Sequence, residues 1–254
     1  MWVVRSSSNS KVFPSELTVK TLIVYNALQG AYTGYIRIFW QPFVLSLGIS
    51  LASIRLLETF SGSSGVLSSV LQLFGGRLSD RFGRKLLCTL GSFFLVLCWL
   101  VAAIAFVIHR SFLIIVSYLL WSASVLALPV LDAALADNVK ESERSRVYSV
   151  VLLANVVPAS ITGFFAGNLA TKSGPVVLLL LASLLEGLGL LLLFKGLRSS
   201  PVVLLVKEDF KTVFKDAVKH WRYFSVFTAD ALSWSISVSL ACSTNKKAFF
   251  KLPI

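Results

Sequence analysis

The chain has 254 residues, of which 56% are hydrophobic and 14% are charged, and its formal net charge is +12 at pH 7. Soluble domains are roughly 45–50% apolar and about 25% charged, so this composition excludes an ordinary soluble domain and indicates a membrane protein. Three cysteines and two histidines make neither a disulfide framework nor a metal-ligand set.

The chain begins with residues 1–20, which lack the charged-then-apolar order and the cleavage site of a signal peptide, so we interpret them as a retained tail. Segments that span a bilayer need roughly 17–25 predominantly apolar residues. Six such segments follow in chain order: 21–46, 51–75, 86–108, 112–136, 147–170 and 175–194. We therefore predict an all-α membrane protein with a six-helix transmembrane bundle over residues 21–194. Residues 223–254 hold an incomplete seventh helix and an atypical C-terminal tail.

Lysine and arginine gather in alternate connectors between these segments. Most of the 24 cations lie in residues 1–20, 76–85, 137–146 and 195–222. This is the positive-inside asymmetry, which predicts a multi-pass protein of the cell membrane with a cytoplasmic N-terminus. Since the asymmetry accounts for most of the net charge, we expect the lipid bilayer as a partner and do not expect a nucleic acid.

Residues 195–222 form the longest polar interval. Lysines recur in it every four residues, against apolar residues on the opposite side: Lys207, Lys211, Lys215 and Lys219. This pattern predicts a basic amphipathic helix on the cytoplasmic membrane surface. A solvated linker helix between two bundles fits the pattern equally well.

The stretch "GGRLSDRFGRK", residues 75–85, carries the most specific signal. It resembles the loop between the second and third helices of the major facilitator superfamily of secondary transporters, whose pattern is Gly, three residues, Asp, Arg, one residue, Gly, Arg, then Arg or Lys. Six positions match it: Gly76, Asp80, Arg81, Gly83, Arg84 and Lys85. A generic basic turn would explain the cations but not Asp80 or the glycine spacing. We place Asp80 just past a helix C-terminus, where the following cations offset the unfavourable dipole, and expect Gly76 and Gly83 to allow a tight turn and close backbone approach.

A second stretch, residues 133–146, resembles the connector between helices four and five of the same family, with Asp137 at a helix end and Arg144 beyond it. The resemblance implies the N-terminal half of a twelve-helix fold. It implies a gate at residues 76–85, in which Asp80 meets the opposite bundle and Arg84 pairs with Asp137. Transport would need a second six-helix bundle, because the resemblance places the substrate between two rocking bundles.

Charged side chains inside apolar segments are costly and therefore usually face a cavity or a partner. Arg37 and Glu186 are the best candidates for a substrate or proton pathway. Asp132 is a further candidate, with a structural role near the inner rim as the stronger alternative. Asn155 either lines the cavity or, with Pro158, bends its helix.

Together these features predict secondary active transport of a small solute by alternating access, coupled to protons and without a cofactor. The polar and basic ending after residue 241 predicts a truncated transporter. The alternatives are a homodimerising half-transporter and a non-transporting membrane subunit. An enzyme is not expected, because no intramembrane Ser/His, paired Asp or metal-ligand cluster has usable spacing.

Overall fold

The computed structural model describes residues 16–62 and 65–197. The chain divides into two compact units at Leu204, and the described residues all belong to the first. The predicted seventh helix, and nearly all of the predicted basic linker, lie outside the described residues. Residues 16–20, which we assigned to the tail, form the first turn of a helix.

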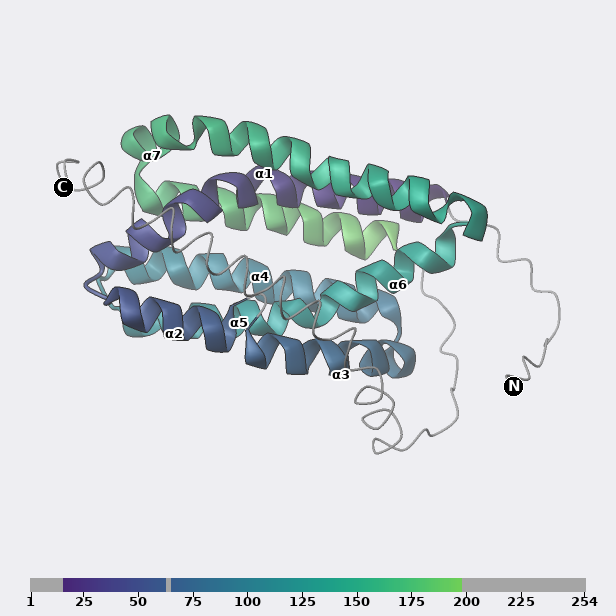
Figure 1. The fold of residues 1–254 in the computed structure, drawn as a ribbon, viewed down its shortest axis with the longest axis horizontal. Coiled ribbons are helices and arrows are strands. Elements are labelled where there is room, and N and C mark those ends of the chain that lie inside the picture. Colours follow the sequence, from purple (N-terminus) through teal and green to yellow (C-terminus); the bar gives the residue numbers. More distant parts are fainter. Residues whose placement is uncertain (1–15, 63–64, 198–254) are drawn as a thin grey trace. The chain divides into compact units, whose positions relative to one another are not determined.

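Figure 1 shows the helices of the N-terminal part of this unit. They are α1 (Glu16–Ser46), α2 (Leu51–Ser61), α3 (Val66–Phe82) and α4 (Arg84–Val107). Ser50 caps α2, because its hydroxyl accepts a hydrogen bond from the backbone N–H of Ser53 at 3.1 Å. α3 and α4 are separated by Gly83 alone, whose φ of 89° is favoured only for glycine.

The remaining elements are α5 (Phe112–Ser124), the 3-10 helix η1 (Val125–Ala127), α6 (Leu128–Asn138), the 3-10 helix η2 (Glu141–Glu143) and α7 (Arg144–Gly196). α5, η1 and α6 follow one another without a gap and form one long helical segment. α7 is interrupted at Gly174, where the backbone is non-helical with φ 70°. The chain turns back there, so the two halves of α7 run in opposite directions (Figure 1).

Four helical segments of the described chain are long and apolar enough to cross a membrane: Arg84–Val107, Phe112–Asn138, Glu141–Ala170 and Ser173–Gly196. They coincide with the last four predicted spans. The predicted count of six is not confirmed. The single segment predicted over 51–75 consists of two helices, α2 with 11 and α3 with 17 residues, and each is shorter than the roughly 20 residues that a spanning helix needs.

The most extensive helix–helix contact of the described residues joins α1 to α7. Small residues bring the two backbones together. A Cβ atom added at Gly30 would lie 2.1 Å from the carbonyl oxygen of Asn155, and one at Gly34 would lie 2.1 Å from that of Ala159. Glycines at this four-residue spacing let helices approach closely in membranes, so α1 is held against the first half of α7.

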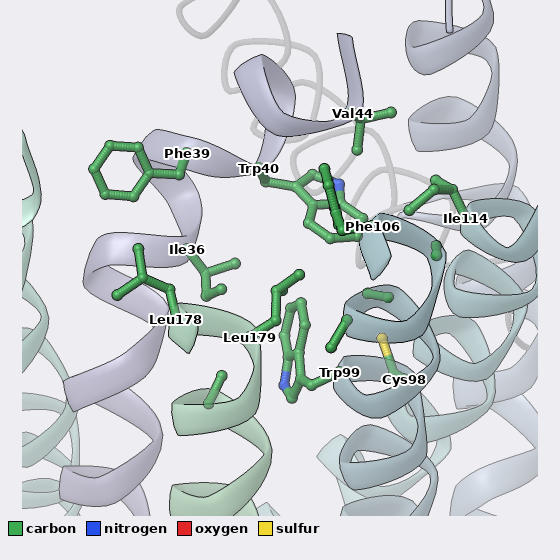
Figure 2. Packing of buried hydrophobic residues seen from close by; sticks show 14 of the residues in the cluster. Ile36, Phe39, Trp40, Val44, Cys98, Trp99, Phe106, Ile114, Leu178 and Leu179 are labelled. Carbon is green, nitrogen blue, oxygen red and sulfur yellow. The ribbon is translucent and has the colours of Figure 1, made fainter. Parts of the chain in front are cut away.

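Two hydrophobic clusters fill the interior of the unit. The larger contains Trp40 and Trp99, with ring centroids 5.8 Å apart, packed among aliphatic side chains of α1, α4, α5 and α7 (Figure 2). The smaller contains Tyr25 of α1 together with Leu87 of α4 and Leu193 of α7. A polar group lies where the two clusters meet.

Candidate functional site

The carboxylate of Glu186 is completely buried between α1, α4 and α7. The hydroxyl of Tyr25 donates to Oε1 at 2.9 Å, and the hydroxyl of Tyr32 donates to Oε2 at 2.8 Å. The hydroxyl of Ser92 also donates to Oε1. Tyr25 and Tyr32 are seven residues apart on α1 and therefore share one helix face, which places both hydroxyls opposite the carboxylate.

Glu186 also lies near the middle of an apolar helix. It follows Ser173 by thirteen residues and precedes Gly196 by ten, within the candidate span formed by the second half of α7. Ten helical residues correspond to about 15 Å, half the thickness of a hydrocarbon core of roughly 30 Å. A buried charge at that depth is expensive unless it is hydrogen-bonded, and the three hydroxyls provide those hydrogen bonds.

The chemistry of the three donors allows two states of the carboxyl group. None of them carries a positive charge, and each hydroxyl can accept as well as donate a hydrogen bond. An ionised Glu186 accepts from all three hydroxyls. A protonated Glu186 can donate its own proton to a hydroxyl oxygen that rotates its hydrogen elsewhere, so the same residues serve both states.

An aromatic group adjoins this site. The rings of Tyr32 and Trp99 meet edge to face with centroids 5.9 Å apart. The indole Nε1 of Trp40 donates to the hydroxyl of Tyr118 at 2.7 Å. By contrast, the buried Nε1 of Trp99 has no hydrogen-bond partner within the described part of the chain. An unpaired buried donor costs free energy, so this N–H is a position at which a solute oxygen or a water would be stabilised.

The other candidates inside the helices lie elsewhere. Arg37 and Asp132 are exposed, on α1 and α6 respectively. The backbone carbonyl of Asp132 accepts a hydrogen bond from the Tyr148 hydroxyl at 2.9 Å. Asn155 is half-buried in the contact between α1 and α7, where its Nδ2 donates to the carbonyl of Asn26 at 3.3 Å. The structure therefore does not bring these three residues to Glu186.

Near one end of the helices, away from Glu186, Arg84 and Asp137 form the ion pair that the resemblance implies. Arg84 also donates from a guanidinium nitrogen to the backbone carbonyl of Ala133 at 2.5 Å. These contacts tie the first residue of α4 to the last turns of α6. The ammonium of Lys85 lies 5.0 Å from the ring centroid of Phe194, which ties α4 to the end of α7.

The placement of the remaining residues of this region corrects the sequence interpretation. Gly76, Asp80 and Arg81 belong to α3 and do not form a connector. Asp80 therefore lies in the last turn of a helix and not beyond it. The tight turn is made by Gly83, as expected, but a Cβ at Gly76 would meet nothing within 4 Å. The close approach occurs instead at Gly75, where a Cβ would lie 2.2 Å from the carbonyl oxygen of Leu126.

Arg144 is the exposed first residue of α7. Sequence reasoning did not identify the three hydroxyl donors of Glu186 or the unpaired Trp99 N–H. The spacing of the two tyrosines on α1 was an available signal, because residues seven apart on a helix lie on one face. Nothing in the sequence alone indicated which face of α4 would carry Ser92 toward α7.

These features define a helical membrane protein with a buried, hydroxyl-lined carboxylate and an arginine–aspartate pair at one end of its helices. The family model of the Major Facilitator Superfamily matches residues 22–250, which is most of the chain. The chain therefore belongs to this superfamily, whose members are membrane transporters and not enzymes. Among curated proteins, none matches the chain. The family resemblance of residues 75–85 is thereby confirmed.

Proposed function

We propose that this chain carries a small solute across the cell membrane by proton-coupled secondary active transport. In this proposal α1, the α2–α3 pair, α4, the α5–α6 segment and the two halves of α7 are six membrane-spanning units, with the N-terminus in the cytoplasm. Two observations support counting α1 among these units. α1 has 31 residues, enough for about 46 Å of helix. Several of its polar side chains, including Tyr25 and Tyr32, are buried in the bundle. Because these side chains do not face lipid, their polarity is compatible with a membrane-spanning α1.

The observation that carries the proposal is the burial of Glu186 among three uncharged hydroxyl donors. An ionisable residue at mid-membrane depth is retained mostly for function, because it destabilises insertion by roughly 2.5–3.5 kcal/mol or more. Hydroxyl partners leave both the ionised and the protonated form hydrogen-bonded. We assign Glu186 as the group that binds and releases the coupled proton.

The solute is proposed to bind next to this group. Trp99 offers an unused N–H donor, and Tyr32 contacts both Trp99 and Glu186. Protonation of Glu186 would free the Tyr32 hydroxyl from donating to the carboxylate, so that it could donate to the solute instead. Binding of the proton and binding of the solute would thereby be linked. Alternating access is proposed to require a second six-helix bundle, supplied in the reconstituted protein by a second copy of this chain, with Asp80 and the Arg84–Asp137 pair acting at the cytoplasmic gate.

Transport in proteoliposomes tests this function. Purified protein is reconstituted, a pH gradient of either sign is imposed, and uptake is measured over a panel of labelled small solutes with and without a protonophore. We expect accumulation of at least one solute above its external concentration, and loss of that accumulation with the protonophore. Absence of uptake for every solute across both gradients would contradict carrier function.

Two matched variants test the role of Glu186. Glu186→Gln keeps the size and the acceptor oxygen but cannot carry a proton, so it should abolish accumulation while the protein stays folded. Glu58→Gln is the control. Glu58 is a half-buried glutamate of α2 whose carboxylate accepts a hydrogen bond from Gln41 Nε2 at 3.3 Å, and its replacement should leave accumulation intact. Full accumulation by Glu186→Gln would exclude Glu186 as the coupling group, even if transport itself were demonstrated.

A further inference from the structure

A groove runs along the surface between α4 and the second half of α7. It has a volume of about 440 Å³ and is lined by one leucine of α4 and by a face of α7 that is apolar except for one serine: Leu100, Leu180, Ser183, Leu184, Gly187, Leu188 and Leu191. A Cβ atom at Gly187 would meet nothing within 4 Å. The groove is therefore open at this position, and a large side chain there would occupy it.

The groove runs lengthwise along the second half of α7. It extends from Leu180 to Leu191, and eleven residues of α-helix rise about 16 Å. Because Glu186 lies near the middle of this span, the groove begins in the leaflet on the side of Lys195 and continues past the midplane. An extended acyl chain that enters from the lysine end would lie along it.

Two lysines mark one end of the groove. Lys195 is exposed and lies four residues, about one turn, beyond Leu191 on α7. The ammonium of Lys85 lies 5.0 Å from the ring centroid of Phe194 on the same helix end. Neither lysine takes part in the ion pairs formed within residues 16–62 and 65–197. Two cations are thus placed beside the mouth of an apolar groove.

We propose that this groove is a specific site for an anionic phospholipid, with one acyl chain along the leucines and the phosphate at Lys85 and Lys195. Charge complementarity decides between this occupant and a helix of another protein. An apolar helix would fill the groove but offer no acceptor to the lysines, whereas a phosphate group carries anionic oxygens that accept from ammonium groups. Basic pockets at the cytoplasmic side of membrane helices bind anionic head groups, and the lysine end is the end for which we predict cytoplasmic orientation.

Native mass spectrometry of the purified full chain in detergent tests the site. Phosphatidylglycerol and phosphatidylcholine with identical acyl chains are titrated separately. We expect one molecule of phosphatidylglycerol to be retained at lipid concentrations that leave phosphatidylcholine unbound. The double variant Lys85→Gln/Lys195→Gln should weaken retention of phosphatidylglycerol by roughly thirtyfold, since each lysine contributes about 1 kcal/mol to anionic lipid binding.

Matched variants separate the groove from general effects. Gly187→Phe should fill the groove and reduce retention, whereas Gly167→Phe, on the first half of α7 where a Cβ also meets nothing within 4 Å, should not. Arg110→Gln removes an exposed cation from the α4–α5 connection and should leave retention unchanged. Equal retention of both lipids, unchanged retention in the double lysine variant, or a mass of two chains in place of the bound lipid would each overturn the proposal.

Discussion

Both halves of α7 are long and apolar enough to cross a membrane, but they differ in what they bury. In the most apolar stretch of the candidate span Glu141–Ala170, which contains the first half, 6% of the residues are buried, against 39% in the most apolar stretch of Ser173–Gly196. The first half meets α1 through small residues and closely spaced backbones. The second half meets α1 and α4 through side chains, among them Glu186.

This difference shows two ways of holding helices together where water does not drive their association. Close backbone packing depends on shape and uses no polar side chain. A buried polar cluster depends on hydrogen bonds and tolerates little change in chemistry. The first half of α7 is thus sensitive to side-chain size along α1, and the second half is sensitive to the chemistry of Tyr25, Tyr32 and Ser92.

The largest effect is expected for Gly34→Val. The added side chain would begin 2.1 Å from the carbonyl oxygen of Ala159 and 2.2 Å from the hydroxyl oxygen of Thr162, so the two helices must separate. Overpacking usually destabilises by about 1–3 kcal/mol, and a clash with backbone should reach at least the upper end. The thermal unfolding midpoint in detergent micelles measures the loss.

Gly167→Ala is the control for that experiment, because its Cβ meets nothing within 4 Å and its helix propensity is better. The unfolding midpoint of this variant should be unchanged or higher. A Gly34→Val protein as stable as the parent would show that the first half of α7 is not held by close backbone approach.

The next largest effect concerns the second half of α7. Tyr32→Phe removes the hydroxyl that donates to Glu186 Oε2, and a hydrogen bond to an ionised group contributes about 1.5–3 kcal/mol. In a Glu186→Gln background the same change should cost about 0.5–1.5 kcal/mol, because the acceptor is neutral. The coupling free energy from this double-mutant cycle measures how much an ionised Glu186 strengthens its hydrogen bond with Tyr32.

The control is Tyr148→Phe, on the first half of α7, whose hydroxyl donates to a backbone carbonyl of Asp132 at an exposed position. It should show no coupling to Glu186→Gln. If Tyr32→Phe also showed none, the Tyr32 hydroxyl would not be stabilising an ionised carboxylate.

From the sequence, the bounds of most helices could be predicted better than the face that each helix buries. The apolar run over 86–108 became α4, Arg84–Val107, because charged residues and Gly83 mark its start. The break between the two halves of α7 was predicted between residues 170 and 175, where one apolar segment ends and the next begins, and it lies at Gly174. The split into α2 and α3 was missed, although residues 61–65 read Ser-Gly-Ser-Ser-Gly, a cluster that is typical of a break between helices.

The same limit applies to the candidate site. Glu186 was identified because a carboxylate in an apolar helix is rare and costly. Arg37 was chosen by the same reasoning but is exposed, since the rule does not say which way a side chain points. The partners of Glu186 come from α1 and α4, so their meeting depends on how three helices rotate against one another.

A smaller difference is expected between two phenylalanines, one on each half of α7. Phe194 lies under the ammonium of Lys85, and a cation–π contact at an exposed site contributes about 0.5–1 kcal/mol. Phe194→Leu should lower the free energy of unfolding by that amount. Phe164 is 84% exposed, and Phe164→Leu should change it by less than about 0.5 kcal/mol. Equal effects of the two changes would show that the Lys85 contact does not stabilise the fold.

The smallest effect is expected for Asn155→Ala. Its amide donates a single hydrogen bond of 3.3 Å to the Asn26 carbonyl, and hydrogen bonds between membrane helices contribute about 0.6 kcal/mol on average. The contact of its backbone carbonyl with Gly30 would remain. We therefore expect a drop of about 0.5 kcal/mol in the free energy of unfolding and unchanged solute accumulation in proteoliposomes. Loss of accumulation with an intact fold would instead place Asn155 in the transport pathway, and the first half of α7 would then carry function as well as packing.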